Sequence, residues 1–201
     1  MIGKWNKSVI LTYIGVAFSA TALAILSPYS EIDIVYAFIC LMMAGVCDMF
    51  DGTVARRCKR TKEEKEFGIQ LDSLVDVFSF IAVPLAILTT INENLYYIPI
   101  FIIYAICGVA RLAHFNTTAP ENSPVKYYEG LPVTFAALIF PLIYLLAFVL
   151  KSNIFIPIYN VVTLIIAILF IVKIKVPKPK LITSIILLLL AVALTTFYIL
   201  V

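Results

Sequence analysis

Long apolar runs dominate this sequence, and they restrict the possible folds more than any other feature. A helix needs about 20 mostly apolar residues to cross a bilayer. The chain of 201 residues contains seven such runs, at about 9–27, 34–50, 69–91, 95–115, 131–150, 154–172 and 181–201. The pattern predicts an all-α integral membrane protein, a multi-span helical bundle of about six to seven transmembrane helices.

Little of the chain remains outside these runs. Charged residues make up 13% of it, against about 25% in soluble domains. We therefore expect a single transmembrane domain over residues 1–201. The first run also has features of a secretory signal, because bases precede it and Ala20-Thr21-Ala22 could be a cleavage site. Its apolar stretch continues through Leu26 and six more runs follow, so a retained first span is expected.

The basic residues are distributed unevenly along the chain. If the N-terminus is cytoplasmic and every run spans, 14 of the 15 Lys and Arg residues are cytoplasmic and Lys151 alone lies outside. This bias follows the positive-inside rule. It predicts a multi-pass protein of the cell membrane with its N-terminus and active site on the cytoplasmic side. The bases adjoin the spans and suit anionic lipid head groups, so no nucleic-acid partner is expected.

The cysteines show no metal-binding spacing. None of the four, Cys40, Cys47, Cys58 and Cys107, forms a CxxC pair. Cys58 is expected to be an interfacial thiol, and the others small packing residues. The sequence predicts neither a disulfide nor a zinc site.

Four aspartates interrupt the second and third apolar runs. Asp48 and Asp51 are three residues apart, and Asp72 and Asp76 are four apart, so each pair projects from one face of its helix. A carboxylate in a span costs about 2.5–3.5 kcal/mol at the bilayer centre. A hairpin folded about residue 62 brings Asp51 level with Asp72, and Asp48 level with Asp76. We expect four carboxylates facing each other at one depth.

Such a cluster needs positive charge to compensate it. An all-oxygen carboxylate set suits Mg²⁺ or Mn²⁺, and Arg56 is the one nearby base placed to pair readily. Alternatively, the aspartates could simply extend into water at the helix ends. Gly52, Ala55 and Gly68 flank the pairs. They favour either close approach of a bulky ligand or close packing of the helices.

These residues together resemble a family signature. The pattern is Asp48-x-x-Asp51-Gly52-x-x-Ala55-Arg56 followed by Gly68-x-x-x-Asp72-x-x-x-Asp76. It is similar to that of the CDP-alcohol phosphotransferases, membrane enzymes that move a substituted phosphoryl group from a CDP-linked donor to an alcohol. The gap of 11 residues between Arg56 and Gly68 is longer than is usual in the family. That difference affects the loop between the two helices.

The resemblance assigns roles to these positions. Asp48, Asp51, Asp72 and Asp76 would hold Mg²⁺ or Mn²⁺, with two ions expected, and Asp76 would also be the catalytic base. Gly52, Ala55, Arg56 and Gly68 would contact the CDP-linked lipid, with Arg56 reaching phosphate oxygens. The family also implies a homodimer.

A second resemblance concerns the acceptor. The segments LDSLVDVFSFIAVP at 71–84, ARLAHFN at 110–116 and EGLPVTFAA at 129–137 are similar to the phosphatidylserine synthase branch, which implies serine as acceptor. His114 stands where that branch more often has Arg. Arg111 would bind the serine carboxylate, with His114 and Asn116 beside it. Arg111 and His114 could equally anchor the helix at the membrane interface.

Other functions are compatible with the same residues. The acceptor could be glycerol phosphate or inositol phosphate, but a phosphate dianion should need more than one extra base. Only Arg111 and Lys126 are available outside the loop between the aspartate pairs, which favours serine. A divalent-cation transporter is a third possibility. Tyr127 and Tyr128, with Lys126, are interpreted as an interfacial anchor, and residues 116–130 as a possible lid.

Overall fold

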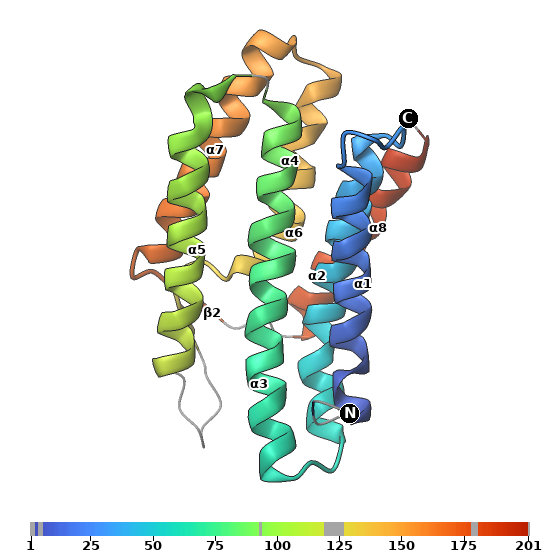
Figure 1. The fold of residues 1–201 in the computed structure, drawn as a ribbon, viewed down its shortest axis with the longest axis vertical. Coiled ribbons are helices and arrows are strands. Elements are labelled where there is room, and N and C mark those ends of the chain that lie inside the picture. Colours follow the sequence, from blue (N-terminus) through green and yellow to red (C-terminus); the bar gives the residue numbers. More distant parts are fainter. Residues whose placement is uncertain (1–2, 4–5, 93, 119–126, 178–180, 201) are drawn as a thin grey trace.

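Helices make up nearly all of the protein. The computed structural model describes residues 3, 6–92, 94–118, 127–177 and 181–200. Its helices, shown in Figure 1, are α1 (Ile10–Ile25), α2 (Ile34–Arg57), α3 (Lys62–Val77), α4 (Val83–Ile91), α5 (Ile98–Thr118), α6 (Ala136–Tyr144), α7 (Ser152–Ile171) and α8 (Leu181–Leu200). The end of the bundle that holds the α2–α3 connection is called the inner end below, and the opposite end the outer end.

The predicted helical membrane fold is confirmed. By length and composition, six helices of the described chain could cross a membrane: Lys7–Ile25, Ile34–Arg57, Lys62–Ile91, Leu95–Thr118, Ser152–Ile171 and Ile182–Leu200. The expected span at 131–150 forms a shorter apolar helix, Val133–Phe148. Pro141 lies inside α6, and 3₁₀ turns precede and follow that helix. Proline removes a backbone hydrogen bond, and the regular α-helix of this segment is limited to the 9 residues of α6.

The hairpin that carries the aspartates has well-defined ends. Asp33 caps α2 by accepting a hydrogen bond from the Val35 N–H at 2.9 Å. Thr61 and Glu64 form a capping box at the start of α3, because each side chain accepts from the other residue's backbone N–H. Thr61 follows directly on the basic connection, so the capping box fixes where the returning helix begins.

A π-helical segment, Phe78–Ala82, separates α3 from α4. The Val83 N–H bonds to the carbonyl of Phe78, and the Tyr104 hydroxyl of α5 donates to the carbonyl of Phe80 at 2.7 Å. The hydroxyls of Ser19 in α1 and Ser79 also share a buried hydrogen bond of 2.6 Å. These contacts tie the segment directly after Asp76 to both neighbouring helices.

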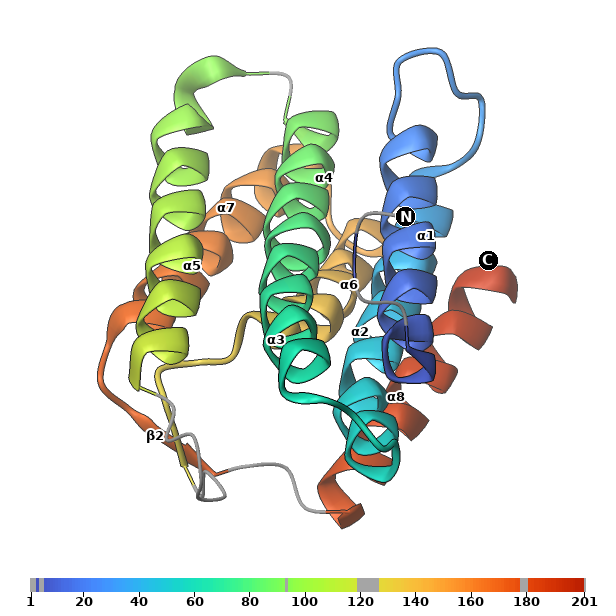
Figure 2. The ribbon, with the colours of Figure 1, turned by 60° about the horizontal axis from the view of Figure 1, so that its bottom comes forward.

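Two short strands cross the inner end. β1 (Tyr127–Glu129) pairs antiparallel with β2 (Lys175–Pro177), so that Glu129 lies opposite Lys175. Figure 2 brings this end forward. Gly130 follows β1 with φ of +75°, and a Cβ there would lie 2.4 Å from the Phe170 carbonyl oxygen. Only glycine fits this crossing, which places residues 127–131 against the end of α7.

Candidate active site

The structure brings the four aspartates together at the inner end. Asp51 and Asp72 are close enough to share a hydrogen bond, and so are Asp48 and Asp76. One carboxylate oxygen from each of Asp48, Asp51 and Asp72 lies within 4.8 Å of the others. These are the pairs that counting from residue 62 predicts. Because each pair comes from two antiparallel helices, the hairpin alone builds the cluster.

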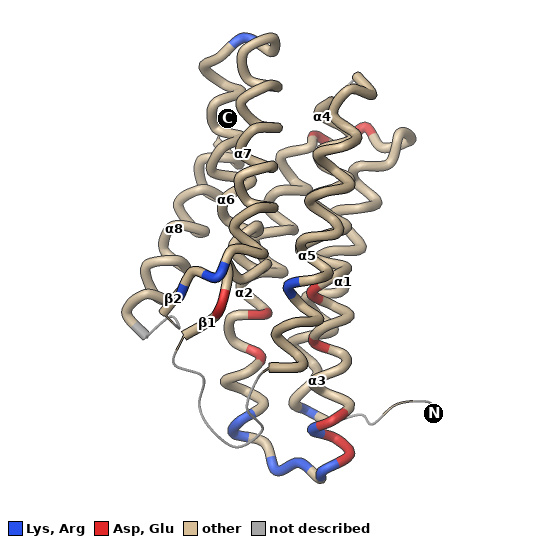
Figure 3. The backbone as a smooth tube through the Cα atoms, turned by 90° about the vertical axis from the view of Figure 1, so that its left-hand side faces the viewer, with Lys and Arg blue, Asp and Glu red and all other residues tan. Residues whose placement is uncertain are grey.

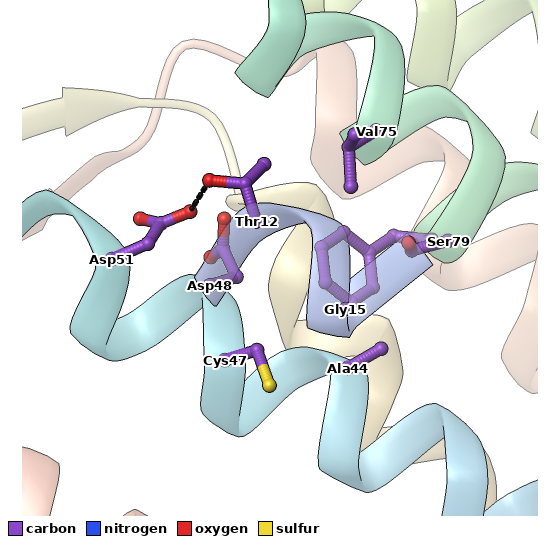
Figure 4. A pocket seen from close by; sticks show the side chains of 9 residues that line it. Thr12, Gly15, Ala44, Cys47, Asp48, Asp51, Val75 and Ser79 are labelled. Atoms are coloured by element: carbon purple, nitrogen blue, oxygen red, sulfur yellow. Dashed lines mark hydrogen bonds between the residues drawn. The ribbon is translucent and has the colours of Figure 1, made fainter. Parts of the chain in front are cut away.

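Helix α1 adds a contact that sequence reasoning missed. The Thr12 hydroxyl donates to Asp51 Oδ2 at 3.1 Å, as Figure 4 shows. Thr12, Asp48, Asp51 and Ser79 line a small pocket at this point. The only signal in the sequence was a polar residue within an apolar run. The hydrogen bond fixes the orientation of the Asp51 carboxylate towards the other acids.

The four acids outnumber the protein cations that face them in the described part of the chain, where Arg111 interacts with Asp76. In the described part of the chain, none of the four carboxylates forms a salt bridge. Arg56, which was expected to pair readily, is exposed and instead donates to Thr53 Oγ1 at 2.9 Å. Crowded carboxylate oxygens that form no salt bridge in the described chain fit a hard divalent cation such as Mg²⁺ or Mn²⁺. Zinc usually has His or Cys among its ligands, and the group consists of aspartates.

The glycines distinguish ligand approach from helix packing. A Cβ added at Gly52 would meet only Arg56 Nη1 at 3.6 Å, and at Gly68 only Arg60 Nη1 at 3.7 Å. By contrast, a Cβ at Gly45 would lie 2.6 Å from the Ala137 Cβ. Close helix packing therefore explains Gly45, but it is the wrong explanation for Gly52 and Gly68. Their surfaces are open beside the aspartates.

Arg111 is directed into the protein from α5. The residue is 7% exposed, its Nε has no hydrogen-bond partner among the described residues, and its guanidinium lies 5.3 Å from the centre of the Phe115 ring. It interacts electrostatically with Asp76. An interfacial anchor would extend its charge into water, so that interpretation of Arg111 is wrong.

The other two residues expected near the acceptor lie differently. His114 Nε2 is 3.3 Å from Glu129 Oε2, and both side chains are about half exposed. The Asn116 amide donates to Ser73 Oγ at 2.7 Å, which links α5 to α3. His114 lines the same pocket as Arg111, but Asn116 does not. Of the three residues expected near the acceptor, Arg111 and His114 therefore line one pocket, and Asn116 lies outside it.

That pocket has a volume of about 210 Å³ and contains charges of both signs. Its charged and polar residues are Arg111, His114, Glu129 and Lys173. Figure 3 shows how basic and acidic segments gather towards this end. Sequence reasoning missed Glu129 and Lys173, because strand pairing across almost 50 residues brings their segments together. Lys126 and most of the proposed lid lie outside the described residues.

Tyr128 also faces the site. Its ring packs 5.7 Å from that of Phe115, whereas Tyr127 is exposed. Burial raises the pKa of the Tyr128 phenol, and the nearby Arg111 guanidinium partly opposes this. The phenol is therefore neutral at physiological pH and can donate a hydrogen bond. Tyr128 thus packs against α5, and its interpretation as an interfacial anchor stays a prediction.

A comparison with protein families assigns the chain. The family described as CDP-alcohol phosphatidyltransferase matches residues 5–200. The chain belongs to this family. The match covers every position of the aspartate signature and also Arg111 and Glu129, so both groups of residues lie within the family domain.

Several curated relatives share part of the chain. The CDP-diacylglycerol–serine O-phosphatidyltransferase of Saccharomyces cerevisiae is 39% identical over 100 residues, covering 46% of this chain and 35% of the relative. The archaetidylserine synthase of Methanothermobacter thermautotrophicus is 33% identical over 114 residues, covering 56% and 47%. The CDP-diacylglycerol–serine O-phosphatidyltransferase of Methanocaldococcus jannaschii is 32% identical over 142 residues, covering 71% and 64%. The aligned regions thus span between about one third and two thirds of these relatives.

Proposed function

We propose that the protein transfers a phosphatidyl group, or its ether-lipid equivalent, from a CDP-linked lipid to the hydroxyl of L-serine, releasing CMP. The observation that carries this proposal is the buried Arg111 beside a four-aspartate cluster. The family supplies the reaction class, and the names of the relatives include serine or archaetidylserine. Residues 1–201 would act as one domain.

The donor would lie over the aspartate hairpin. Asp48, Asp51, Asp72 and Asp76 would hold two ions, Mg²⁺ or Mn²⁺. When bound, these ions would supply positive charge that balances the donor pyrophosphate and the leaving CMP. The open surfaces at Gly52 and Gly68 support close approach of the nucleotide. Ala55 would be part of the same surface, and Arg56 would turn from Thr53 to a phosphate oxygen.

The acceptor would approach from the α5 side. Asp76 would take the proton of the serine hydroxyl, whose oxygen bonds to phosphorus as the bond to CMP breaks. Arg111 would hold the serine carboxylate, because a guanidinium offers two parallel donors to it. His114 lines the same pocket, while Asn116 would position Ser73 and thereby α3 near Asp72.

A substitution at Arg111 tests the acceptor assignment. In Arg111→Lys the point charge remains but the two-point contact is lost. We expect the KM for serine to rise about tenfold or more, equivalent to at least 1.4 kcal/mol, with little change for the CDP-lipid. Steady-state kinetics with each substrate varied in turn give both constants. Equal increases for both substrates would contradict this role.

The proposed orientation of the protein in the membrane rests on the distribution of its basic residues. Ten of the eleven described Lys and Arg residues belong to the inner end, and Lys151 precedes α7 at the outer end. The positive-inside rule then favours a cytoplasmic inner end, including the N-terminus and the active site, in the cell membrane. A homodimer would follow the family pattern.

Lys173 supports a second candidate. With Arg111 it gives the pocket two bases, which is the feature expected for glycerol phosphate or inositol phosphate as acceptor. The deciding experiment incubates purified protein with ester- and ether-linked CDP-lipids, Mn²⁺ or Mg²⁺, and each alcohol in turn. We expect a serine-containing lipid and CMP by mass spectrometry. A phosphorylated product would favour the second candidate, and metal uptake into liposomes without CMP release would favour a transporter.

A further inference from the structure

The pocket beside Arg111 contains a carboxylate that the aspartate chemistry does not use. Glu129 is the last residue of β1, away from α2 and α3, and lines the pocket together with Arg111 of α5. An acid among two bases would be unfavourable in a site built only for an anion. Its presence calls for a cationic group on the ligand.

The backbone around Glu129 is held firmly. Glu129 pairs with Lys175 across the strands, and the Gly130 N–H donates to the Ile174 carbonyl at 2.9 Å. The Leu131 N–H donates to the Leu169 carbonyl at 2.9 Å. His114 contacts only Glu129 Oε2, and the described chain gives Oε1 no hydrogen-bond partner. One carboxylate oxygen is thus available on a residue whose backbone is held in place.

Arg111 supplies the opposite charge. It is more than nine-tenths buried and lines the pocket, yet its Nε donates to nothing in the described chain. An unpaired donor in this environment is unfavourable, and a ligand carboxylate would satisfy it. The pocket therefore presents a buried cation and a half-exposed anion within one cavity of about 210 Å³.

We infer that Glu129 binds the ammonium group of the acceptor while Arg111 binds its carboxylate, so that the pocket selects a zwitterionic amino alcohol over a phosphorylated alcohol. This inference rests on the proposed serine transfer and adds the residue that sets its specificity. A phosphate dianion would meet Arg111 and Lys173 but would be repelled by Glu129. Glu129 thus decides between the two acceptor classes that the bases alone leave open.

Two fragments of serine separate the contacts. Ethanolamine lacks the carboxylate, and 3-hydroxypropionate lacks the ammonium group. In Glu129→Gln we expect the KM for serine to rise about tenfold, the scale of one charge-assisted hydrogen bond. The inhibition constant of 3-hydroxypropionate should not rise, because this anion loses only a repulsion from Glu129, and the KM for the CDP-lipid should not change. Arg111→Lys should instead weaken 3-hydroxypropionate and leave ethanolamine nearly unaffected.

A control variant separates the loss of this particular carboxylate from the loss of one negative charge elsewhere in the protein. Glu31→Gln removes an exposed carboxylate from the outer end and should change none of these constants. Equal weakening of serine and 3-hydroxypropionate in Glu129→Gln would show that Glu129 only shapes the pocket, and would overturn the inference. An unchanged KM for serine in that variant would overturn it while leaving serine transfer intact. Wild-type protein that uses a phosphorylated alcohol and not serine would overturn both proposals.

Discussion

The inner and outer ends of the bundle are built from different contacts. At the outer end Tyr144 packs against Phe38 and Phe155, with ring centres 4.5 and 5.7 Å apart. The polar pair there, Asn92 and Asn160, is hydrogen bonded across helices at 2.6 Å. At the inner end, acids lie side by side without a salt bridge in the described chain, and the Arg111 Nε has no hydrogen-bond partner there. In the described chain, the outer end pairs its two amides with each other, although Asn160 Oδ1 has no partner, whereas the inner end presents a cluster of acids and the Arg111 Nε to ligands.

The largest effect should come from Asp76. Replacement by Asn removes the proposed base, and general-base catalysis contributes about 10²–10⁴-fold, so turnover should fall to a similar extent. CDP-lipid should still bind, as a ligand-dependent shift in thermal stability would show. Asp33→Asn is the matched control at the outer end, because Asn also caps helices well. A near-normal rate in Asp76→Asn would remove the chemical distinction between the ends.

Substitutions at two glycines of α2 should have the next largest effects. One should lower stability, and the other should weaken binding of the CDP-lipid. Gly45→Val places new atoms against Ala137, and overpacking of this kind costs about 1–3 kcal/mol, so the melting temperature should fall. Gly52→Val has open space around it, so stability should hold while the KM for CDP-lipid rises about tenfold. Thermal unfolding in detergent and steady-state kinetics separate the two results. A loss of stability in Gly52→Val would restore the packing explanation.

The smallest effect should come from the outer polar pair. Asn160 is fully buried and its amide donates to Asn92 Oδ1. Interhelical hydrogen bonds in membranes average about 0.6 kcal/mol, so Asn92→Ala should lower stability slightly and leave catalysis unchanged. A double-mutant cycle with Asn160→Ala measures the coupling. A marked fall in turnover would show that the outer end takes part in function.

Much of this architecture could be predicted from sequence because its causes are local. The length of each apolar run decides whether a helix can span, and equal counts from residue 62 decide which aspartates meet. The exception among the spans is 131–150, where Pro141 and the flanking 3₁₀ turns shorten the α-helix. That interruption depends on local backbone geometry that an average of hydrophobicity does not detect.

The acceptor pocket was less predictable because its residues meet through distant pairing. Glu129 and Lys173 are brought together only when β1 pairs with β2 and Gly130 crosses the end of α7. Thr12 likewise depends on how α1 packs against α2. No spacing rule connects such positions. Arg56 lies near the end of α2 that carries the aspartates, as its place in the sequence requires. The direction of its side chain, however, depends on the neighbouring Thr53 hydroxyl.

The π-helical turn at Phe78–Ala82 divides the long helix Lys62–Ile91 into an acidic half and an apolar half, and it sets the rotation of one relative to the other. A wider turn adds a residue to the winding, so the rotational phase of the acidic half is offset by about 100° from that of the apolar half, the angle of one helical residue. Deleting one residue there would swing Asp72 and Asp76 around the helix axis without altering either half. The π-helical turn thus determines the direction in which Asp72 and Asp76 project, independently of how the apolar half packs against neighbouring helices.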